Sequence, residues 1–450
     1  MSDEIEPSGT IGSSDEPQTS SQHGPARRGR KIIVVAVAIC LIGGGIGVAV
    51  AESGAPGNAS TPAAAVNRLL DAADHSDLLG AIDAIAPGER NAIEPGFVGL
   101  VHQLERLDVL SPSTNLSDVG GLSLHFAGVK TATAMLSPTV AAVSITGGSV
   151  TGSLDAGKLP IGSFVRGLTR GLLPPASRTS TSSVSTGREA IVTEKVAGTW
   201  YVSLGYTIAY DVLRSEGLPG VSPTVSAAVS ATGSSTPEGA VRVLLSDAAA
   251  FNLRGLLSDL PPGELGALQG YAGLFLGKAG AAAAKARSQV SVRITSLKMS
   301  SSAVAGGTLV QIGGIGLAVS YDGVTFSYKG GCLTYGYEGR SVRRCATNAT
   351  SSAEFRRILA ALPLSLRGLA MRFTASRPAL GFVTVQEGSR WFVSPVATLF
   401  EDVNASLSTL KPRDLGSIAS LLEHPAAAEA LAHSLEQLLL GALASGSSSL

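Results

Sequence analysis

The chain has 450 residues, of which 44% are hydrophobic, so it is long and apolar enough to form two packed domains. Lysine plus arginine number 34, and aspartate plus glutamate also number 34. This balance excludes the strongly basic surface that is typical of nucleic-acid-binding proteins, so nucleic acid is not an expected partner.

The first 31 residues are rich in Ser, Gly, Pro and charged side chains and contain few apolar ones. Such a composition cannot bury enough surface to offset the entropy that the chain loses when it becomes ordered. We therefore predict a disordered cytoplasmic tail over residues 1–31.

Ile32–Ala51 is a run of twenty residues without a charge. A helix rises about 1.5 Å per residue, so this run matches the ~30 Å hydrocarbon core of a bilayer. We predict a single transmembrane helix that anchors the protein in the cell membrane. The basic residues directly before it place the N-terminus in the cytoplasm and the rest of the chain outside: Arg27, Arg28, Arg30 and Lys31.

A cleaved secretory signal is the alternative for this segment, because Ala49-Val50-Ala51 resembles a small-x-small cleavage site. The apolar run is longer than the roughly 7–15 residues of a signal core, which favours a retained anchor. Gly43 and Gly47 form a Gly-x-x-x-Gly pair. This pair suggests the hypothesis of a homodimer, because it lets two such helices approach closely.

Two later stretches of the chain are related by an offset of 175 positions (236 minus 61). Between Thr61–Glu89 and Thr236–Glu264, 12 of 29 aligned positions are identical without a gap. Both stretches begin with Thr-Pro and end with Pro-Gly-Glu. A duplication is the simplest explanation.

Each copy predicts helices followed by strands. Threonine before proline is a typical helix start, because the hydroxyl caps the first turn and proline fits the first helical position. Apolar residues then recur at helical spacing. We predict one helix from the Thr-Pro and a second, short helix that ends at the Pro-Gly. A third is expected around Phe97–Leu107 in the first copy and Leu265–Phe275 in the second.

After the helices, apolar and polar residues alternate, as they do in half-buried strands. Asp322-Gly323 predicts a two-residue hairpin turn, because these residue types tolerate positive φ angles, and Gly147-Gly148 is its expected counterpart. The alternating apolar positions are Leu122, Leu124 and Phe126 in the first copy and Val290, Val292 and Ile294 in the second.

The copies match again near Trp200 and Trp391, where the offset is 191, so the second copy has gained a net sixteen residues (191 minus 175). We predict that these tryptophans anchor the last strand of each core. The matching Asp211 and Asp402 are expected to cap or pair with a residue at the end of each sheet.

The expected fold class is therefore α+β. A transmembrane helix precedes two duplicated domains, each with helices first and an antiparallel sheet afterwards. The expected boundaries are a first domain at 61–215, a flexible linker at 216–235, a second domain at 236–412 and a broken amphipathic helical segment at 413–450.

Cys332 and Cys345 are candidates for a disulfide, because the folded part is expected outside the cytoplasm. Twelve residues separate them. Closing a loop of this size contributes about 3 kcal/mol in the chain-entropy account. The alternative is a metal-binding pair, but no histidine lies nearby in the sequence.

The segment between these cysteines concentrates aromatic and cationic side chains. Arginine binds phosphate or carboxylate through its planar fork, and tyrosine stacks on sugar rings or cations. We predict a clamped binding loop that contacts an anionic envelope polymer, lipid headgroups or an acidic protein. A solvated insertion is the alternative. The candidate residues are Tyr335, Tyr337, Arg340, Arg343 and Arg344.

The motifs Thr61-Pro62, Pro87-Gly88-Glu89 and Gly198-Thr199-Trp200-Tyr201-Val202, with their partners in the second copy, resemble the cystatin-like (nuclear transport factor two-like) superfamily. The second copy departs by one residue, with Ser389-Arg390 between its glycine and its tryptophan. The resemblance implies helices against a curved antiparallel sheet, in the setting of actinobacterial-type single-pass envelope proteins. Members of the superfamily use the mouth of this cone to bind small molecules or partners, and a minority catalyse reactions there.

The sequence shows no catalytic or phosphate-binding motif, and its six histidines lack metal-ligand spacing. No catalytic residue, metal ligand or cofactor is therefore assigned, and His125 is expected to face water rather than the mouth of the cone. The sequence predicts a membrane-anchored, extracytoplasmic binding or scaffolding module of the cell envelope. The alternatives are an enzyme or small-ligand-binding protein that uses the cone pocket, and a purely structural spacer.

Overall fold

The computed structural model describes residues 59–112, 114–168, 178–183, 190–218, 220–223, 228–329, 332–337, 339–345, 367 and 380–416. All of these residues belong to one compact unit, Gly44–Leu450. The predicted tail, the predicted membrane helix and most of the predicted C-terminal segment lie outside them. Among the described helices, none combines the length and apolar character that crossing a membrane requires.

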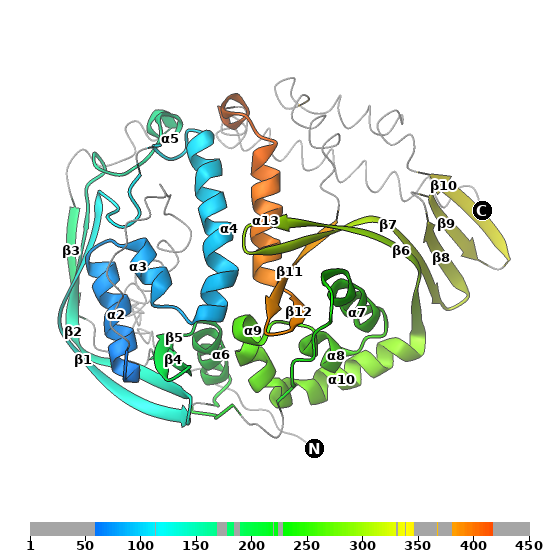
Figure 1. Ribbon diagram of the computed structural model, residues 1–450, viewed down its shortest axis with the longest axis horizontal. Helices are drawn as coiled ribbons and strands as arrows, with labels where there is room; N and C mark the ends of the chain where they lie inside the picture. Colours follow the sequence, from blue (N-terminus) through cyan, green and yellow to red (C-terminus); the bar gives the residue numbers. More distant parts are fainter. Residues whose placement is uncertain are drawn as a thin grey trace, which may run out of the picture. The chain divides into compact units, whose positions relative to one another are not determined.

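The first repeat opens with helices, continues as an antiparallel sheet and closes with a helix (Figure 1). Its described elements are α2 (Pro62–Asp74), α3 (Leu78–Asp83), α4 (Pro87–Arg106), β1 (Leu122–Ser137), β2 (Val140–Leu154), α5 (Ser163–Leu168), β3 (Arg178–Ser183), β4 (Ala190–Val196), β5 (Thr199–Val202) and α6 (Leu204–Ser215).

The second repeat follows the same plan, with two additional strands in its sheet. Its described elements are α7 (Pro237–Ala249), α8 (Leu253–Ser258), α9 (Pro262–Gly270), α10 (Ala272–Gln289), β6 (Val290–Val304), β7 (Gly307–Tyr321), β8 (Val324–Lys329), β9 (Cys332–Tyr337), β10 (Arg340–Cys345), β11 (Gly381–Glu387), β12 (Arg390–Val393) and α13 (Pro395–Ser408).

The two sheets share a common path. The first has the order β1-β2-β4-β5, with β3 beside β2, and the second has the order β10-β9-β8-β7-β11-β12, with β6 beside β7. The path β6-β7-β11-β12 therefore corresponds to β1-β2-β4-β5. Figure 1 shows each sheet curving around its opening helices, so both repeats are mixed α+β units with curled antiparallel sheets.

The predicted helix starts at the two Thr-Pro pairs are confirmed. The Thr61 hydroxyl oxygen accepts a hydrogen bond of 3.2 Å from the Ala64 amide, and the Thr236 hydroxyl oxygen accepts one of 3.0 Å from the Gly239 amide. These bonds satisfy amides that have no partner within their own helix.

The predicted third helix was placed too late in the chain. It begins at Pro87 in the first repeat and at Pro262 in the second, so the Pro-Gly-Glu motif opens this helix. Proline occupies the first helical turn, where its missing N–H leaves no carbonyl unpaired. In the second repeat the helix is divided, because Leu265 has non-helical backbone angles and Tyr271 separates α9 from α10.

The expectation that each unit ends with its sheet was incomplete. The closing helices α6 and α13 follow the last strands, and Asp211 and Asp402 lie within them rather than at a sheet end. Ser203 and Ser394 cap these helices through their hydroxyl groups. The serine directly after each tryptophan strand thus marks the start of a closing helix. The fold expected from the sequence did not include these two helices.

The Asp322-Gly323 hairpin is confirmed. Both residues have positive φ angles, +46° and +75°, and Tyr321 pairs with Val324 across the turn. The prediction of a similar turn at Gly147-Gly148 was wrong, because both glycines lie inside β2.

The Gly147-Gly148 pair forms a bulge. The β1–β2 register shifts beside Lys130, which pairs with Gly147, and Gly148 has a φ angle of +127°. The β6–β7 pair also shifts its register, beside Lys298 opposite Gly314. Bulges bend the strands and interrupt the edges of both sheets, which protects the edges from pairing with other chains.

Each opening helix packs its apolar face into the concave side of its sheet. Val66 contacts Val143 and Val202 in the first repeat, and the core of the second contains Val241 and Val310. Trp200 is buried beside Ala59 and Ala141, and Trp391 packs against the equivalent cluster of the second repeat. The prediction that the tryptophans are core anchors is confirmed for Trp200, whereas Trp391 packs against its core cluster but is only partly buried.

A short segment before each opening helix pairs with the tryptophan strand. The Trp200 amide donates to the Ala59 carbonyl over 2.9 Å, and Ser234 and Trp391 exchange two backbone hydrogen bonds of 2.8 Å. Ser234 and the buried Val229 belong to the segment predicted as the linker at 216–235. The described part of that segment therefore contributes to the packing of the second repeat.

Candidate functional site

Strands β9 and β10 distinguish the described part of the second repeat from the first, and together with β8 they form a surface that we call the β8–β10 extension, Val324–Cys345. Strand β8 pairs with β7 in the position that β3 takes on β2, and β9 and β10 continue the sheet outward as a hairpin. The described residues of the first repeat contain no counterpart of β9 and β10. The extension contributes to the net gain of sixteen residues that the two offsets indicate.

One face of the extension is aromatic. The register places Phe326 opposite Tyr335 and Tyr335 opposite Val342, while Val324 lies opposite Tyr337, so all of these side chains share one face. The rings of Phe326 and Tyr335 lie 5.0 Å apart and are tilted by 50°. Four apolar residues of this face are 38% to 45% exposed: Phe326, Tyr328, Tyr337 and Val342.

The other face is polar. It carries Thr325, Ser327 and Lys329 on β8, and Arg343 on β10 opposite Thr334. Arg340 pairs with Tyr337 and therefore lies on the aromatic face, at the tip of the hairpin. The extension thus has one aromatic and one polar face, and each face carries at least one cationic side chain.

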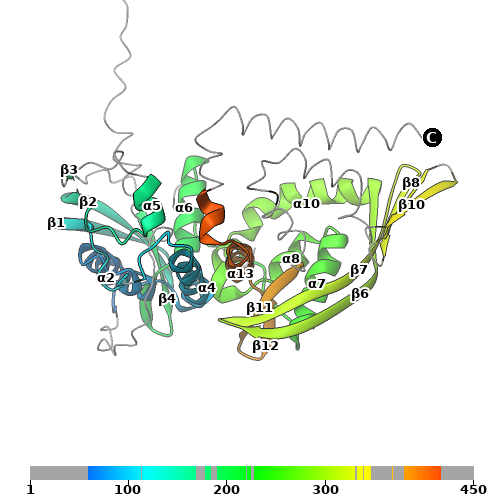
Figure 2. The same ribbon diagram turned by 90° about the horizontal axis from the view of Figure 1, so that it is seen from above.

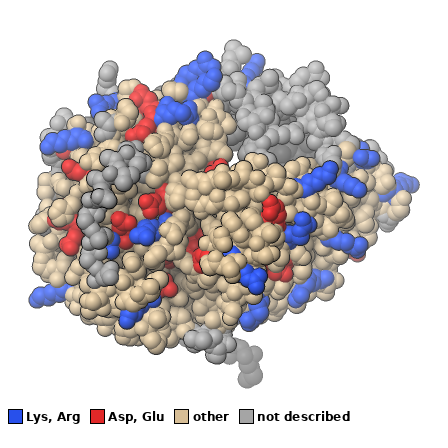
Figure 3. Space-filling view, viewed as in Figure 1, with Lys and Arg blue, Asp and Glu red and all other residues tan. Residues whose placement is uncertain are grey.

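Cations dominate the extension. Its three strands contain four of them and no Asp or Glu. Blue Lys and Arg side chains gather at the right-hand end of Figure 3, where Figure 1 shows β8, β9 and β10. The cationic residues are Lys329, Arg340, Arg343 and Arg344, of which the Arg344 side chain lies outside the described atoms.

The structure revises the predicted binding loop in two ways. The five candidate residues lie on two paired strands, not in an irregular loop, and Arg343 lies on the face opposite Tyr335, Tyr337 and Arg340. Phe326, Tyr328 and Val342 join the aromatic face, although the predicted set did not include them. Phe326 and Tyr328 alternate with polar residues in the sequence, which indicates a strand but not that its apolar face stays exposed.

Cys332 and Cys345 are directly opposed in the β9–β10 register. Opposed residues of antiparallel strands have Cα atoms about 4.5–5.5 Å apart, which falls within the range of disulfides. The register is therefore compatible with the predicted bridge at the base of the hairpin, and the bond itself stays a prediction.

No protein-family model matches the chain, and no curated protein or solved structure does. The site is therefore interpreted from its own geometry.

A second group of polar and aromatic side chains lies where the two repeats meet, a surface that we call the junction. Helix α4 packs on α13 of the other repeat, and α6 packs on α9 (Figure 1; Figure 2). The Asn404 side-chain amide donates to the Gly96 carbonyl over 3.0 Å. Arg106 donates to the carbonyl oxygens of Leu407 and Leu410, and so caps the C-terminal end of α13 from the other repeat.

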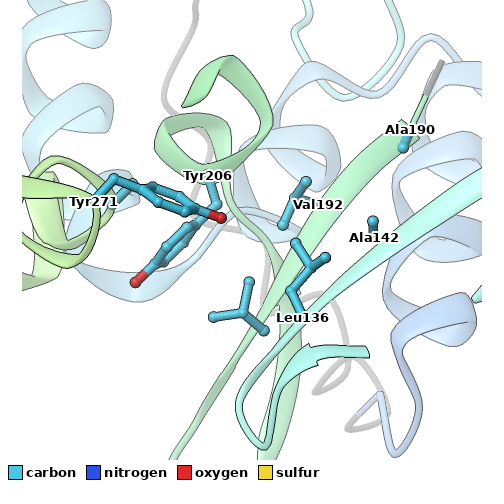
Figure 4. Close-up of a cluster of buried hydrophobic side chains, with 8 residues drawn as sticks. Leu136, Ala142, Ala190, Val192, Tyr206 and Tyr271 are labelled. Atoms are coloured by element: carbon cyan, nitrogen blue, oxygen red, sulfur yellow. The ribbon is translucent and has the colours of Figure 1, made fainter. Parts of the chain in front are cut away.

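An apolar cluster extends across the junction. Tyr206 on α6 meets Tyr271, which separates α9 from α10, with ring centroids 6.0 Å apart in an edge-to-face arrangement. Figure 4 shows these two rings beside Leu136 and Val192 of the first sheet. Burial raises the pKa of Tyr271 to about 12 and also raises the pKa of Tyr206, which favours the uncharged form of both rings.

The glutamates of the Pro-Gly-Glu motifs cap the closing helices. Glu89 accepts hydrogen bonds from the Ser203 hydroxyl (2.7 Å) and from the Leu204 and Gly205 amides (2.7 and 2.9 Å). Glu264 accepts bonds from the Ser394 hydroxyl and the Val396 amide in the same way. A carboxylate is favoured there, because the N-terminus of a helix carries partial positive charge.

Burial raises the pKa of both glutamates, and their hydrogen bonds oppose that shift. Glu194 on β4 lies near Glu89, and burial together with the charge of Glu89 raises its pKa to about 7. Glu387 accepts bonds from the Gly263 amide, and burial raises its pKa as well. The junction therefore holds several carboxyl groups that are harder to ionise than in water.

His125 is 70% exposed at its side chain and pairs with Asp74 over 3.0 Å, so the prediction that it faces water is confirmed. Within the ranges that the structure describes, no group of three or more His, Cys, Asp or Glu side chains is arranged to hold a metal ion.

Proposed function

We propose that the protein is an extracytoplasmic binding module of the cell envelope, tethered by a membrane helix at 32–51, and that the β8–β10 extension is its binding surface. The observation that carries this proposal is the exposed aromatic face of the extension, bordered by arginines. Side chains of this kind are rarely left exposed together unless they contact a partner.

The chemistry of the extension favours an anionic glycan polymer. Tyrosine rings present a flat apolar surface with a polar edge, which suits the faces of sugar rings. Arginine forks suit the carboxylate or phosphate groups that such polymers carry. The strands hold both kinds of group in fixed positions, so little side-chain and loop entropy is lost on binding.

The contacts at the junction support a scaffolding role in addition to binding. Helices of each repeat pack on helices of the other, and Arg106 caps α13 across the junction. Two repeats joined in this way hold the extension in a fixed orientation relative to the first repeat. The chain thus presents one binding edge on a rigid support.

We also propose that each repeat is a cystatin-like cone, because opening helices lie in the concavity of a curved antiparallel sheet. The concave faces contain apolar side chains such as Val66, Val143 and Val202 in the first repeat and Val241 and Val310 in the second. A cone filled in this way supports a binding module at the sheet edge over an enzyme that uses the cone pocket.

The test is binding of the detergent-solubilised full chain to purified envelope glycan over a series of salt concentrations. The arginine variant Arg340→Ala/Arg343→Ala/Arg344→Ala and the aromatic variant Tyr335→Ala/Tyr337→Ala are each expected to bind at least several-fold more weakly than wild type. Wild-type binding is expected to fall as salt rises, because salt screens exposed charges.

The matched control is Lys278→Ala/Lys285→Ala/Arg287→Ala, which removes three exposed cations from α10 and should bind like wild type. Vesicles that contain anionic phospholipid form a second arm. Unchanged glycan binding by both extension variants would contradict the proposal. Binding to vesicles and not to glycan would reassign the surface to lipid headgroups.

A further inference from the structure

Helix α10 exposes a face whose counterpart in the first repeat is covered by another helix. With the offset of 175 positions, Leu274 of α10 corresponds to Gly99 of α4, and Ala281 corresponds to Arg106. A Cβ atom on Gly99 would lie 2.7 Å from the Asn404 side chain of α13, and Arg106 donates to carbonyl oxygens of the same helix. In the first repeat, α13 therefore covers this face of α4.

The equivalent face of α10 has no such cover among the described residues. The chain is kinked at Leu265 and divided at Tyr271, and α10 packs on α8, α9 and β6 of its own repeat. The solvent-facing residues recur at spacings of four, three and four, so they lie on one side of the helix. We call this side the outer face of α10, and its residues are Leu274, Lys278, Ala281 and Lys285.

The outer face is cationic. Helix α10 carries Lys278, Lys285 and Arg287 and contains no Asp or Glu, whereas α4 contains three glutamates. All three cations are exposed, and no ion pair joins them to another residue in the described ranges. Leu274 is 46% exposed, and only small side chains lie between the two lysines on this face. A flat anionic surface could approach such a helix closely.

The described chain begins on the same side of the molecule as α10. Ala59 accepts a hydrogen bond from the Trp200 amide of β5. Figure 1 shows β5 and α10 in the lower half of the molecule and β10 in the upper half. The predicted membrane helix ends at Ala51, eight residues before Ala59 (59 minus 51), and the chain between them can span at most about 30 Å. Such a tether keeps the side that carries α10 close to the bilayer.

We propose that the outer face of α10 lies on a bilayer that contains anionic phospholipid, with Lys278 and Lys285 on lipid phosphates and Leu274 at the acyl boundary. This inference rests on the membrane tether of the proposed function. Each cation near an anionic surface strengthens binding about fivefold, so α10 alone binds weakly. The tether supplies the effective concentration that makes the contact persist.

The consequence is a fixed orientation of the two repeats. With α10 on the bilayer, the β10 end of the extension points away from the membrane and toward the envelope. A tether alone would leave the repeats free to rotate, so the second contact is what holds the binding surface outward.

The test is photo-crosslinking of the full chain in reconstituted vesicles. A photoreactive amino acid replaces Leu274, and the vesicles contain phosphatidylcholine alone or phosphatidylcholine with phosphatidylglycerol. We expect phospholipid adducts from position 274, detected by mass spectrometry, to be several-fold more abundant with phosphatidylglycerol. Their yield should fall as salt rises, because salt screens the attraction between exposed charges.

Two variants with three cations removed from different surfaces form a matched pair. In Lys278→Ala/Lys285→Ala/Arg287→Ala, the anionic-lipid gain in adducts from position 274 should be lost. In Arg340→Ala/Arg343→Ala/Arg344→Ala it should be retained. Glycan binding should respond in the opposite way, so failure of the α10 contact and failure of the proposed binding surface are separate results.

Equal adduct yields in the two kinds of vesicle would overturn the proposal, because the tether alone brings position 274 near lipid. Adducts with a second copy of the chain would also overturn it and assign the outer face to a dimer. Flotation with phosphatidylcholine vesicles at high salt reads the tether independently. A chain that does not float there, yet gives the anionic-lipid adducts when added to vesicles, would contradict the membrane helix and support the α10 contact.

Discussion

Gly88 and Gly263 occupy equivalent positions in the two repeats (263 minus 88 equals 175) and pack backbone against backbone. A Cβ atom on Gly88 would lie 2.3 Å from the carbonyl carbon of Gly263. Each glycine contacts its own equivalent, so the two repeats meet with local two-fold symmetry. This relationship explains why α4 and α9 carry glycine directly after their opening proline.

Gly88→Ala is predicted to destabilise the protein by about 1–3 kcal/mol, because the backbones must separate to admit the methyl group. The measurement is the urea midpoint of unfolding, followed by tryptophan fluorescence. Gly266→Ala on α9 is the control, because a Cβ there meets nothing within 4 Å. That substitution should be neutral or stabilising, since alanine favours helix. Equal effects of the two substitutions would refute the close contact.

Glu89→Ala is predicted to cost about 2 kcal/mol of folding free energy, because it removes the acceptor for the Ser203 hydroxyl and the first amides of α6. Glu89→Gln should cost less, since it keeps an acceptor oxygen and loses only the charge. Glu216→Ala, an exposed carboxylate at the end of α6, serves as control. A Glu89→Ala variant as stable as the control would show that the cap is not needed.

Stability is predicted to fall as pH rises from about 5 to about 8. The pKa of Glu194 is raised from 4.5 to about 7 by burial and by the charge of Glu89, so the folded state holds its proton to higher pH than the unfolded state does. Its stabilising contribution is complete below pH 4.5 and is lost as pH passes through about 7.

Glu194→Gln should remove part of this pH dependence, on the order of 2 kcal/mol across the range, because glutamine cannot ionise. Urea midpoints at several pH values measure it. The raised pKa values of Glu89, Glu264 and Glu387 act in the same direction, so a weaker slope should remain in the variant. Parallel pH profiles for wild type and variant would argue against the shifted pKa.

The opposed Cys332 and Cys345 are predicted to form a disulfide. Thiol alkylation followed by mass spectrometry should label one of the three cysteines, Cys40, before reduction and all three afterwards. Reduction should lower the free energy of unfolding of the extension by about 3 kcal/mol, because the open loop gains chain entropy in the unfolded state. Labelling of all three cysteines without reduction would exclude the bridge.

The sequence predicted those parts of the fold whose signals are local. Thr-Pro starts a helix through the threonine hydroxyl and the fixed φ angle of proline, and Asp-Gly turns a hairpin because its residues accept positive φ angles. The matching Thr-Pro and Pro-Gly-Glu motifs, 175 positions apart, were enough to locate both repeats. These features depend on a few neighbouring residues, so the local structure that they form does not depend on how the rest of the chain packs.

Other features were missed because their partners lie far apart in the chain. Glu89 has the pattern of an ordinary polar residue after Pro-Gly, yet its carboxylate meets Ser203, 114 residues later. Gly147-Gly148 has the composition of a turn, but tertiary strand pairing converts it into a bulge. The candidate binding residues of the extension were predicted in part, because composition indicates aromatic and cationic groups but not which of two sheet faces each occupies.

Photo-crosslinking in living cells tests the central claim most directly, because it reports the location and the contact of the extension together. A photoreactive amino acid replaces the exposed Tyr337 in one strain and the exposed Leu274 of α10 in a control strain. The account predicts a protease-resistant adduct with envelope glycan from position 337 and none from position 274. Adducts with cytoplasmic proteins, or equal glycan adducts from both positions, would contradict it.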